Sequence, residues 1–229
     1  MTECGLPTVI LFGSTARGDN DAQSDIDILI LEKDAFPKSI KEGALEIQKL
    51  SRHDAMRKAI SGDLFMLHVV HEGKVISDPN GFFSPLRESF VIKDSYAKER
   101  REALLLASFI ESNWMNFSNR NLLNKRIAWS VRTIVISQLI EEGKIIFSPK
   151  GLCESVQEVD ISSLIGMRRS SDDPSIVMPA LREFLLLRGG REFLDLDKRE
   201  FAKEIKSLGK SVALSTFRNF LSGNAGFSY

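Results

Sequence analysis

Cysteine is scarce in this sequence, and long apolar runs are missing. Only two cysteines occur among 229 residues, Cys4 and Cys153, and they form no CxxC pair. A disulfide framework and a cysteine-rich zinc site therefore have no support, and a reducing compartment fits. The longest apolar run, ALLLASFI, is far shorter than the roughly 20 residues that cross a membrane. We expect a cytoplasmic protein without a membrane segment.

Neither sign of charge is in excess. Lys plus Arg and Asp plus Glu both total 31, so the formal net charge is +0 at pH 7. Such a balance provides no general attraction for a nucleic-acid backbone, which disfavours a long nucleic acid as partner. Hydrophobic residues make up 43% and charged residues 27% of the chain, as in ordinary globular proteins. The length is enough for one or two domains.

The first third of the chain alternates between strand-like and helix-like segments. TVILF and DIDILIL read as strands, and the turn-rich GSTARGDNDAQS between them begins like a helix. Residues 37–60 have amphipathic spacing and predict a helix. DLFMLHVV then predicts a strand, HEGK a tight hairpin and KVISD a short strand. This alternation is typical of an α/β fold.

Beyond residue 85 the pattern becomes helical. Pro79, Gly81 and Pro85 cluster where the alternating strand and helix pattern gives way to a helical one, which places a domain boundary near residue 86. Apolar spacing after it predicts helices over 95–117, 121–142, 175–188 and 197–221. We therefore expect two domains, residues 1–85 and 86–229.

Two aspartates stand in the second predicted strand. Alternate strand side chains share a face, so Asp25 and Asp27 point the same way, roughly 7 Å apart. Two like charges beside a buried strand are costly unless a cation meets them. Carboxylate oxygens are ligands that Mg²⁺ prefers, and Mg²⁺ often binds substrate phosphates as well. A magnesium site is the functional interpretation; two solvated residues at the mouth of an edge strand are the alternative.

A glycine and a serine precede these aspartates at the turn after the first strand. Gly13 permits close backbone approach, and N–H groups at a helix start together with the Ser14 hydroxyl suit a phosphate. Arg17 could add positive charge, although an ordinary surface arginine fits equally. Neither a Walker A motif nor GxGxxG is present.

Taken together, GSTARG and SDIDILIL resemble the signature of the DNA polymerase β-like nucleotidyltransferase superfamily, above all its minimal and aminoglycoside nucleotidyltransferases. The resemblance covers residues 8–31 well and extends loosely to about residue 80. It implies an α/β nucleotidyltransferase core, a mixed sheet flanked by helices. A mostly α-helical bundle domain, residues 86–229, would follow and form the other side of the cleft.

The resemblance also implies roles for individual residues. Gly13 and Ser14 would bind the nucleoside triphosphate, with help from Arg17, and Asp25 and Asp27 would be catalytic and hold two Mg²⁺ ions. Such enzymes usually add a third carboxylate on a neighbouring strand. Asp63, at the start of DLFMLHVV, is the candidate third catalytic and metal residue. His68, on the opposite face of that predicted strand, is its rival.

The implied activity is a nucleotidyltransferase of the EC 2.7.7 type. AMP from ATP would pass to an acceptor hydroxyl on a small molecule or a protein. The alternative is an antitoxin-like or regulatory protein that binds, and in some cases nucleotidylates, a partner protein, and a homodimer is also open. A nucleotide-binding protein without catalysis is a third reading. No histidine follows residue 71, so the helical half lacks the R-x4-6-H ribonuclease motif that often accompanies minimal nucleotidyltransferases.

Overall fold

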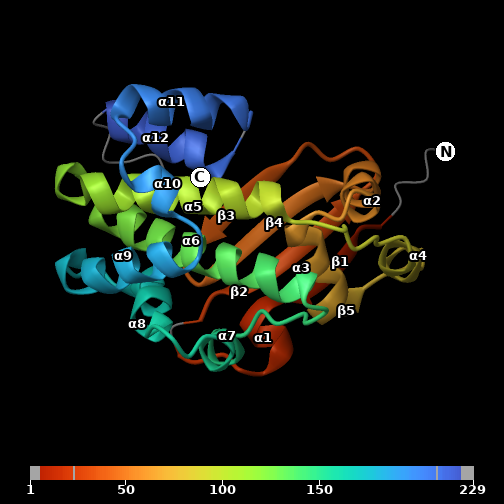
Figure 1. Cartoon of the computed structure of the whole chain (residues 1–229). Coiled ribbons are helices and arrows are strands. Elements are labelled where there is room, and N and C mark those ends of the chain that lie inside the picture. Colours follow the sequence, from red (N-terminus) through yellow and green to blue (C-terminus); the bar gives the residue numbers. More distant parts are fainter. Residues whose placement is uncertain (1–5, 23, 210, 223–229) are drawn as a thin grey trace. The chain divides into compact units, whose positions relative to one another are not determined.

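The computed structural model in Figure 1 describes residues 6–22, 24–209 and 211–222. Cys4 lies outside these residues, and Cys153 is a free cysteine. The chain divides into two compact units, Met1–Asp94 and Ser95–Ser228. In the parts of the chain described, no helix combines the length and the apolar character that crossing a bilayer needs.

A mixed five-stranded sheet organises the first unit. The strand order is β3-β4-β2-β1-β5. β1 runs antiparallel to β2 and β5, β2 runs parallel to β4, and β3 runs antiparallel to β4. The strands are β1 (Thr8–Phe12), β2 (Ile26–Glu32), β3 (Lys38–Glu42), β4 (Leu45–Ser51) and β5 (Lys74–Ser77).

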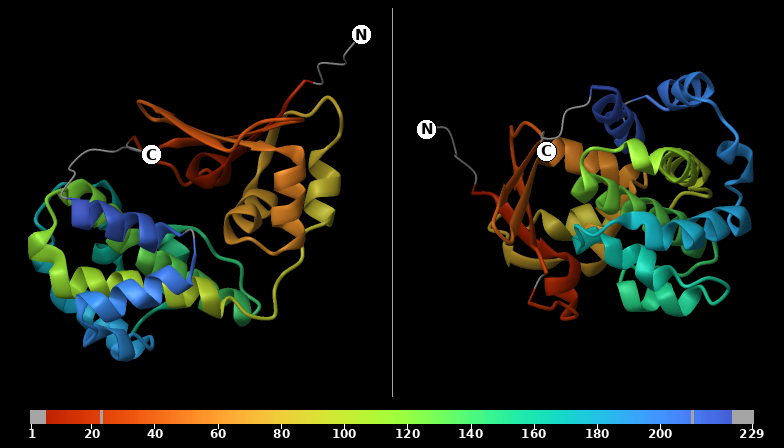
Figure 2. Two further views of the ribbon diagram at one scale, coloured as in Figure 1. Left: turned by 90° about the horizontal axis from the view of Figure 1, so that it is seen from above. Right: turned by 90° about the vertical axis from the view of Figure 1, so that its left-hand side faces the viewer.

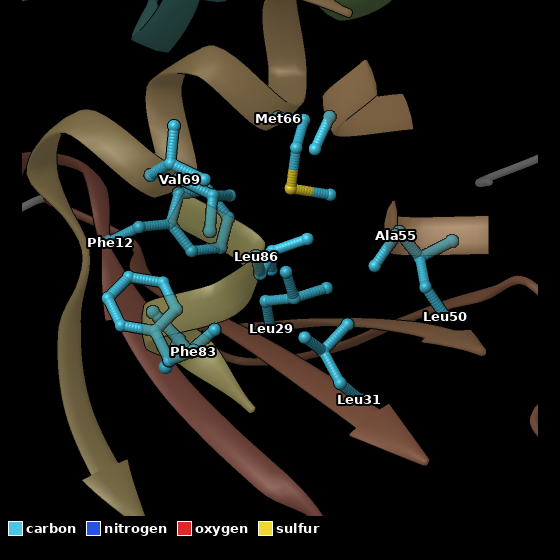
Figure 3. Close-up of a cluster of buried hydrophobic side chains, with 12 residues drawn as sticks. Phe12, Leu29, Leu31, Leu50, Ala55, Met66, Val69, Phe83 and Leu86 are labelled. Atoms are coloured by element: carbon cyan, nitrogen blue, oxygen red, sulfur yellow. The ribbon is translucent and has the colours of Figure 1, made fainter. Parts of the chain in front are cut away.

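Three helices lie against one face of this sheet (Figure 2). They are α2 (Arg52–Ile60), α3 (Leu64–Glu72) and α4 (Phe83–Glu88), whereas the short α1 (Gly13–Arg17) connects β1 to β2. Figure 3 shows the core between sheet and helices, where Leu29 and Leu31 of β2 meet Met66 and Leu86, all fully buried. Ile28 and Ile30 alternate with these leucines and are only half-buried.

The second unit is helical. Its two longest helices, α5 (Ala97–Asn113) and α6 (Arg120–Glu141), pack on each other. Phe109 of α5 stacks on Phe201 at 4.2 Å between ring centroids and meets Phe217 edge-on at 5.3 Å. The remaining α-helices are α7 (Pro149–Ser155), α8 (Ile161–Gly166), α9 (Met178–Leu187), α10 (Arg191–Leu194), α11 (Lys198–Ser207) and α12 (Val212–Ser222). Short 3₁₀ turns lie at Trp114–Asn116, Met167–Arg169 and Pro174–Val177.

The predicted fold class is confirmed: a mixed sheet with flanking helices is followed by a helical part. TVILF and KVIS are strands, DIDILIL is a strand from Ile26 onward, GSTAR is a helix, and the long helices predicted near 95–117 and 121–142 are present. The single helix predicted over 197–221 is instead two, α11 and α12, with a break around Gly209.

The helix predicted over residues 37–60 is wrong for most of its length. The segment forms a hairpin of β3 and β4, turning at Gly43 and Ala44, and becomes helical only at Arg52. Ser51 caps this helix by accepting the N–H of Asp54 at 2.9 Å. Pairing with β2 along seven positions explains why β4 is a strand, since tertiary pairing outweighs a weak helical period.

The strand predicted for DLFMLHVV is also wrong, because Leu64–Glu72 is helix α3. A short continuous apolar run does not distinguish a buried strand from a buried helix. The deciding signal is Asp63, whose side chain accepts the Met66 N–H at 3.0 Å as an N-cap. The predicted HEGK hairpin is absent for the same reason, since Gly73 directly follows the helix and β5 begins at Lys74.

Candidate active site

The turn after β1 brings its backbone against an aspartate. Phe12 is extended, with φ −139° and ψ −175°, and Gly13 begins α1 with φ +74°. A Cβ atom on Gly13 would run into the carboxylate of Asp27. Phe12, the N-cap residue, provides no side-chain acceptor for the first N–H groups of this helix. The turn therefore presents backbone donors directly beside a carboxylate.

Asp25 and Asp27 lie at the start of β2. Asp25 directly precedes the strand, Asp27 is its second residue, and both are half-buried. Asp27 pairs with Phe12 of β1, and the backbone carbonyl of Asp25 accepts the Thr15 hydroxyl at 3.4 Å. The structure thus brings together the Gly13–Ser14 turn and the aspartate pair, as the sequence led us to expect.

A further carboxylate, missed by the sequence analysis, lies beside the pair. Glu46 of β4 pairs directly with Asp27, and Lys41 of β3 pairs with Glu46. Paired residues on neighbouring strands share a face, so these side chains form a row across the sheet. The Lys41 ammonium lies 2.9 Å from Asp25 Oδ1 and 3.9 Å from Glu46 Oε2. The expected third carboxylate belongs on a strand next to β2, and Glu46 meets that description. It was missed because residues 37–60 were predicted to be a helix.

Asp63 is used structurally. Besides capping α3, its carboxylate pairs with Lys58 at 2.7 Å. No strand carries it, and β2 has β1 and β4 as its neighbours. The expectation that Asp63 stands on a strand beside the aspartates is therefore corrected, and Glu46 holds that position. His68, its rival, lies on α3 and contacts Phe12 edge-on at 5.6 Å between ring centroids.

Arg17 ends α1, and its guanidinium is engaged by carboxylates. Nη1 lies 2.6 Å from Glu72 Oε2, while Nε and Nη2 each lie 3.1 Å from Asp19 Oδ1. Burial acts to lower the pKa of Arg17, but the carboxylates of Asp19 and Glu72 outweigh it and raise the pKa above its usual value. Arg17 is permanently charged here.

The donor set suits a hard cation that also binds phosphate. Asp25, Asp27 and Glu46 offer only carboxylate oxygens, which Mg²⁺ prefers. Within the described residues, no three His, Cys, Asp or Glu side chains stand close enough to form a ready-made metal site. Mg²⁺ commonly takes one or two carboxylates and completes its shell with water and phosphate oxygens. Gly13 has no Cβ atom, so its backbone approaches the Asp27 carboxylate closely, and a phosphate bound to the N–H groups of this turn would lie near a cation held by Asp27.

Comparison with known proteins identifies the class of this unit. Residues 7–102 match the family model described as the nucleotidyltransferase domain. A protein of Methanocaldococcus jannaschii, named "Putative protein adenylyltransferase", is 50% identical over 67 residues, which are 29% of this chain and 61% of that relative's length. Residues 7–102 therefore carry a nucleotidyltransferase domain of the DNA polymerase β-like superfamily, which confirms the resemblance. A nucleotidyltransferase domain is what the predicted enzyme class, EC 2.7.7, requires.

A solved structure also resembles the chain. The nucleotidyltransferase-like protein from Exiguobacterium sibiricum aligns over 97% of this chain and 86% of its own, with 13% identity and a TM-score of 0.32. At that score the likeness carries no argument about the site.

Proposed function

We propose that this chain is a Mg²⁺-dependent nucleotidyltransferase that transfers AMP from ATP to an acceptor hydroxyl and releases pyrophosphate. One observation carries the proposal: the Gly13 backbone lies against the Asp27 carboxylate, with Glu46 on the next strand. A phosphate-binding turn and neighbouring carboxylates at one end of the interior strands suit phosphoryl transfer, in which positioning and charge supply most of the acceleration.

Each residue has a proposed role in this reaction. The first N–H groups of α1 and the Ser14 hydroxyl hold the triphosphate, and Arg17 supports them from the other end of the same helix. Asp25 and Asp27 hold magnesium, with two ions by analogy with the family. Glu46, in place of Asp63, is the third carboxylate. Bound Mg²⁺ would neutralise the phosphates and stabilise the attacking and leaving oxygens.

The reaction exchanges one bond for another. The acceptor oxygen bonds to the α-phosphorus, the bond from that phosphorus to the pyrophosphate oxygen breaks, and the hydroxyl proton passes to Glu46 Oε2. Half-buried carboxylates on neighbouring strands fix the direction of attack because their backbone register is rigid.

For the acceptor, we propose a protein hydroxyl. The name of the Methanocaldococcus jannaschii relative, a protein adenylyltransferase, supports this choice. The helical unit, Ser95–Ser228, is our candidate for acceptor selection. A small-molecule hydroxyl is the other acceptor class, and a regulatory, partner-binding role is the alternative function.

A labelling experiment tests the proposal. The protein is incubated with Mg²⁺ and each of the four α-³²P nucleoside triphosphates, alone and with candidate acceptor proteins and aminoglycosides. We expect label from ATP on a protein band, and none with Asp25→Asn. Glu32→Gln, at the other end of β2 where Glu32 pairs with Lys49, is the matched control and should keep activity. Tight ATP binding by calorimetry without pyrophosphate release would overturn the enzymatic proposal in favour of a binding protein.

A further inference from the structure

A compact ion-pair cluster joins α1 to α3. Glu72 Oε2 lies 2.6 Å from Arg17 Nη1 and 2.6 Å from His68 Nε2, so one carboxylate oxygen serves both partners. The side chains of Glu72, Arg17 and His68 are only 8%, 17% and 19% exposed. Nothing in the proposed reaction uses Glu72 or His68 directly, and the burial of a charged group calls for an explanation.

Helix α3 also contacts Phe12, at the start of the turn that leads into α1. Phe12, the residue before Gly13, meets Phe65 and His68 of α3 edge-on, each at 5.6 Å between ring centroids. Phe12 is also the strand partner of Asp27. α3 therefore contacts the residue before the Gly13–Ser14 turn through aromatic rings and the residue that ends α1 through the Glu72 carboxylate.

Arg17 is poorly placed to serve as a free phosphate ligand. Each of its three guanidinium nitrogens already has a carboxylate oxygen within 3.1 Å, from Glu72 or Asp19. Turning the Arg17 guanidinium towards a triphosphate would leave the buried Glu72 carboxylate without its guanidinium partner, which is unfavourable. A helix of only five residues needs support from outside to hold its N–H groups in place.

We propose that Glu72, supported by His68, is a positioning residue for the triphosphate site. It acts through Arg17, which ties α1 to α3 and so fixes the Gly13–Ser14 turn. This inference rests on the proposed nucleotidyl transfer and assigns Arg17 an indirect part in it. Glu72 accepts from both partners, with the His68 Nε2–H and the Arg17 guanidinium as donors.

The direction in which Glu72→Gln changes the KM for ATP distinguishes the two possible roles of Arg17. If Arg17 is a tie, Glu72→Gln loosens the turn, and we expect the KM for ATP to rise about tenfold while kcat changes less than about threefold. If Arg17 instead binds phosphate directly, Glu72→Gln frees it and the KM falls or stays the same. Steady-state kinetics over a range of ATP concentrations measures both constants.

Companion variants keep the test decisive should Glu72→Gln fold poorly. His68→Gln retains an N–H donor for Glu72 and should keep a KM close to that of the wild type, whereas His68→Leu should raise it about threefold. His71→Gln is the matched control, since His71 lies on the same helix with its side chain exposed. An unchanged KM in both Glu72→Gln and His68→Leu overturns the inference.

A binding measurement distinguishes this failure from that of the proposed function. Calorimetry with Mg²⁺ and ATP should show weaker binding for Glu72→Gln than for the wild type. If the wild type binds ATP but transfers no label, the enzymatic proposal fails while the positioning role stands on the binding data. If the wild type transfers label and Glu72→Gln binds ATP equally well, only the positioning role fails.

Discussion

The two units of the chain use their carboxylates in contrasting ways. In the helical unit, Asp160, Asp173 and Asp197 each accept an N–H group at the start of a helix. Hydrogen bonds from nearby serine hydroxyls or backbone groups hold the pKa of each below its usual value. Helix capping therefore accounts for these three aspartates.

The sheet unit has a second kind of carboxylate besides its helix caps. Asp27 and Glu46 face each other across β2 and β4, and Asp25 shares the Lys41 ammonium with Glu46. None of the three begins a helix. The comparison teaches that an acid explained by a neighbouring N–H group is structural, whereas acids gathered from separate strands need a cation and so indicate chemistry.

Replacing Asp27 should have the largest effect on turnover. We expect Asp27→Asn to reduce turnover about a thousandfold, roughly 4 kcal/mol of transition-state stabilisation, because a neutral amide is a poor ligand for magnesium. The label-transfer rate measures this loss. Asp160→Asn makes the same chemical change at a helix cap and should leave the rate unaltered. Near-normal turnover in Asp27→Asn would erase the distinction between the two kinds of acid.

Gly13→Ala tests the close approach of the turn to Asp27. A methyl group there would meet the Asp27 carboxylate, so we expect turnover to fall about a hundredfold as the acid is displaced. Gly189 of the helical unit also has a positive φ, +90°, but a Cβ atom there would meet nothing within 4 Å. Gly189→Ala therefore controls for backbone strain, about 1–2 kcal/mol, without the collision. Equal turnover in the two variants would count against the assigned contact.

The third carboxylate can be identified by a pair of conservative changes. We expect Glu46→Gln to lower kcat about tenfold to a hundredfold, because it removes the proposed proton acceptor. Asp63→Asn keeps a capping oxygen for α3 and should alter kcat less than about twofold. Parallel measurement of kcat decides between them, and the reverse order would restore Asp63 to the role that the sequence assigned to it.

The sequence predicted the parts of the site that depend on local spacing. The GS turn and the D-x-D strand follow from the first 31 residues, since turn glycines and strand alternation are local signals, and the mixed sheet followed from the family resemblance that these residues carry. Glu46 and Glu72 could not be found in this way. Glu46 becomes adjacent to Asp27 only through parallel pairing of β2 with β4, and Glu72 reaches Arg17 only because Leu64–Glu72 is helical.

The prediction that Asp63 lies on a strand was wrong for a related reason. Asp63 precedes an apolar run whose period does not separate strand from helix, and the aspartate itself was the helix signal. A residue that reads as a strand-borne ligand in one secondary structure becomes an N-cap in the other. Long-range pairing, which a single sequence does not display, decides which reading applies.

The smallest effects should come from one structural acid in each unit. Asp78 accepts the Thr8 hydroxyl and the N–H groups of Phe82 and Phe83, at 2.8, 2.9 and 2.8 Å. Burial acts to raise the pKa of Asp78, but these donors outweigh it and lower the pKa below its ordinary value. Glu141 is its counterpart, because the donors Arg100, Tyr96 and Ser95 likewise outweigh burial and lower the pKa of Glu141.

A carboxylate with a lowered pKa contributes stability above its unfolded-state pKa and loses it as the pH falls through its folded-state pKa. Asp78→Asn and Glu141→Gln should therefore each reduce the free energy of unfolding at pH 7 by about 1–3 kcal/mol. As the pH falls through these lowered folded-state pKa values, the difference from the wild type should shrink, since the wild-type acids then become protonated as well. Denaturant unfolding at several pH values measures this convergence. Label transfer well below the unfolding temperature should stay within about twofold of the wild type, because neither acid belongs to the row around Asp27. A pH-independent difference would show that packing, and not the charged hydrogen bonds, makes these acids structural.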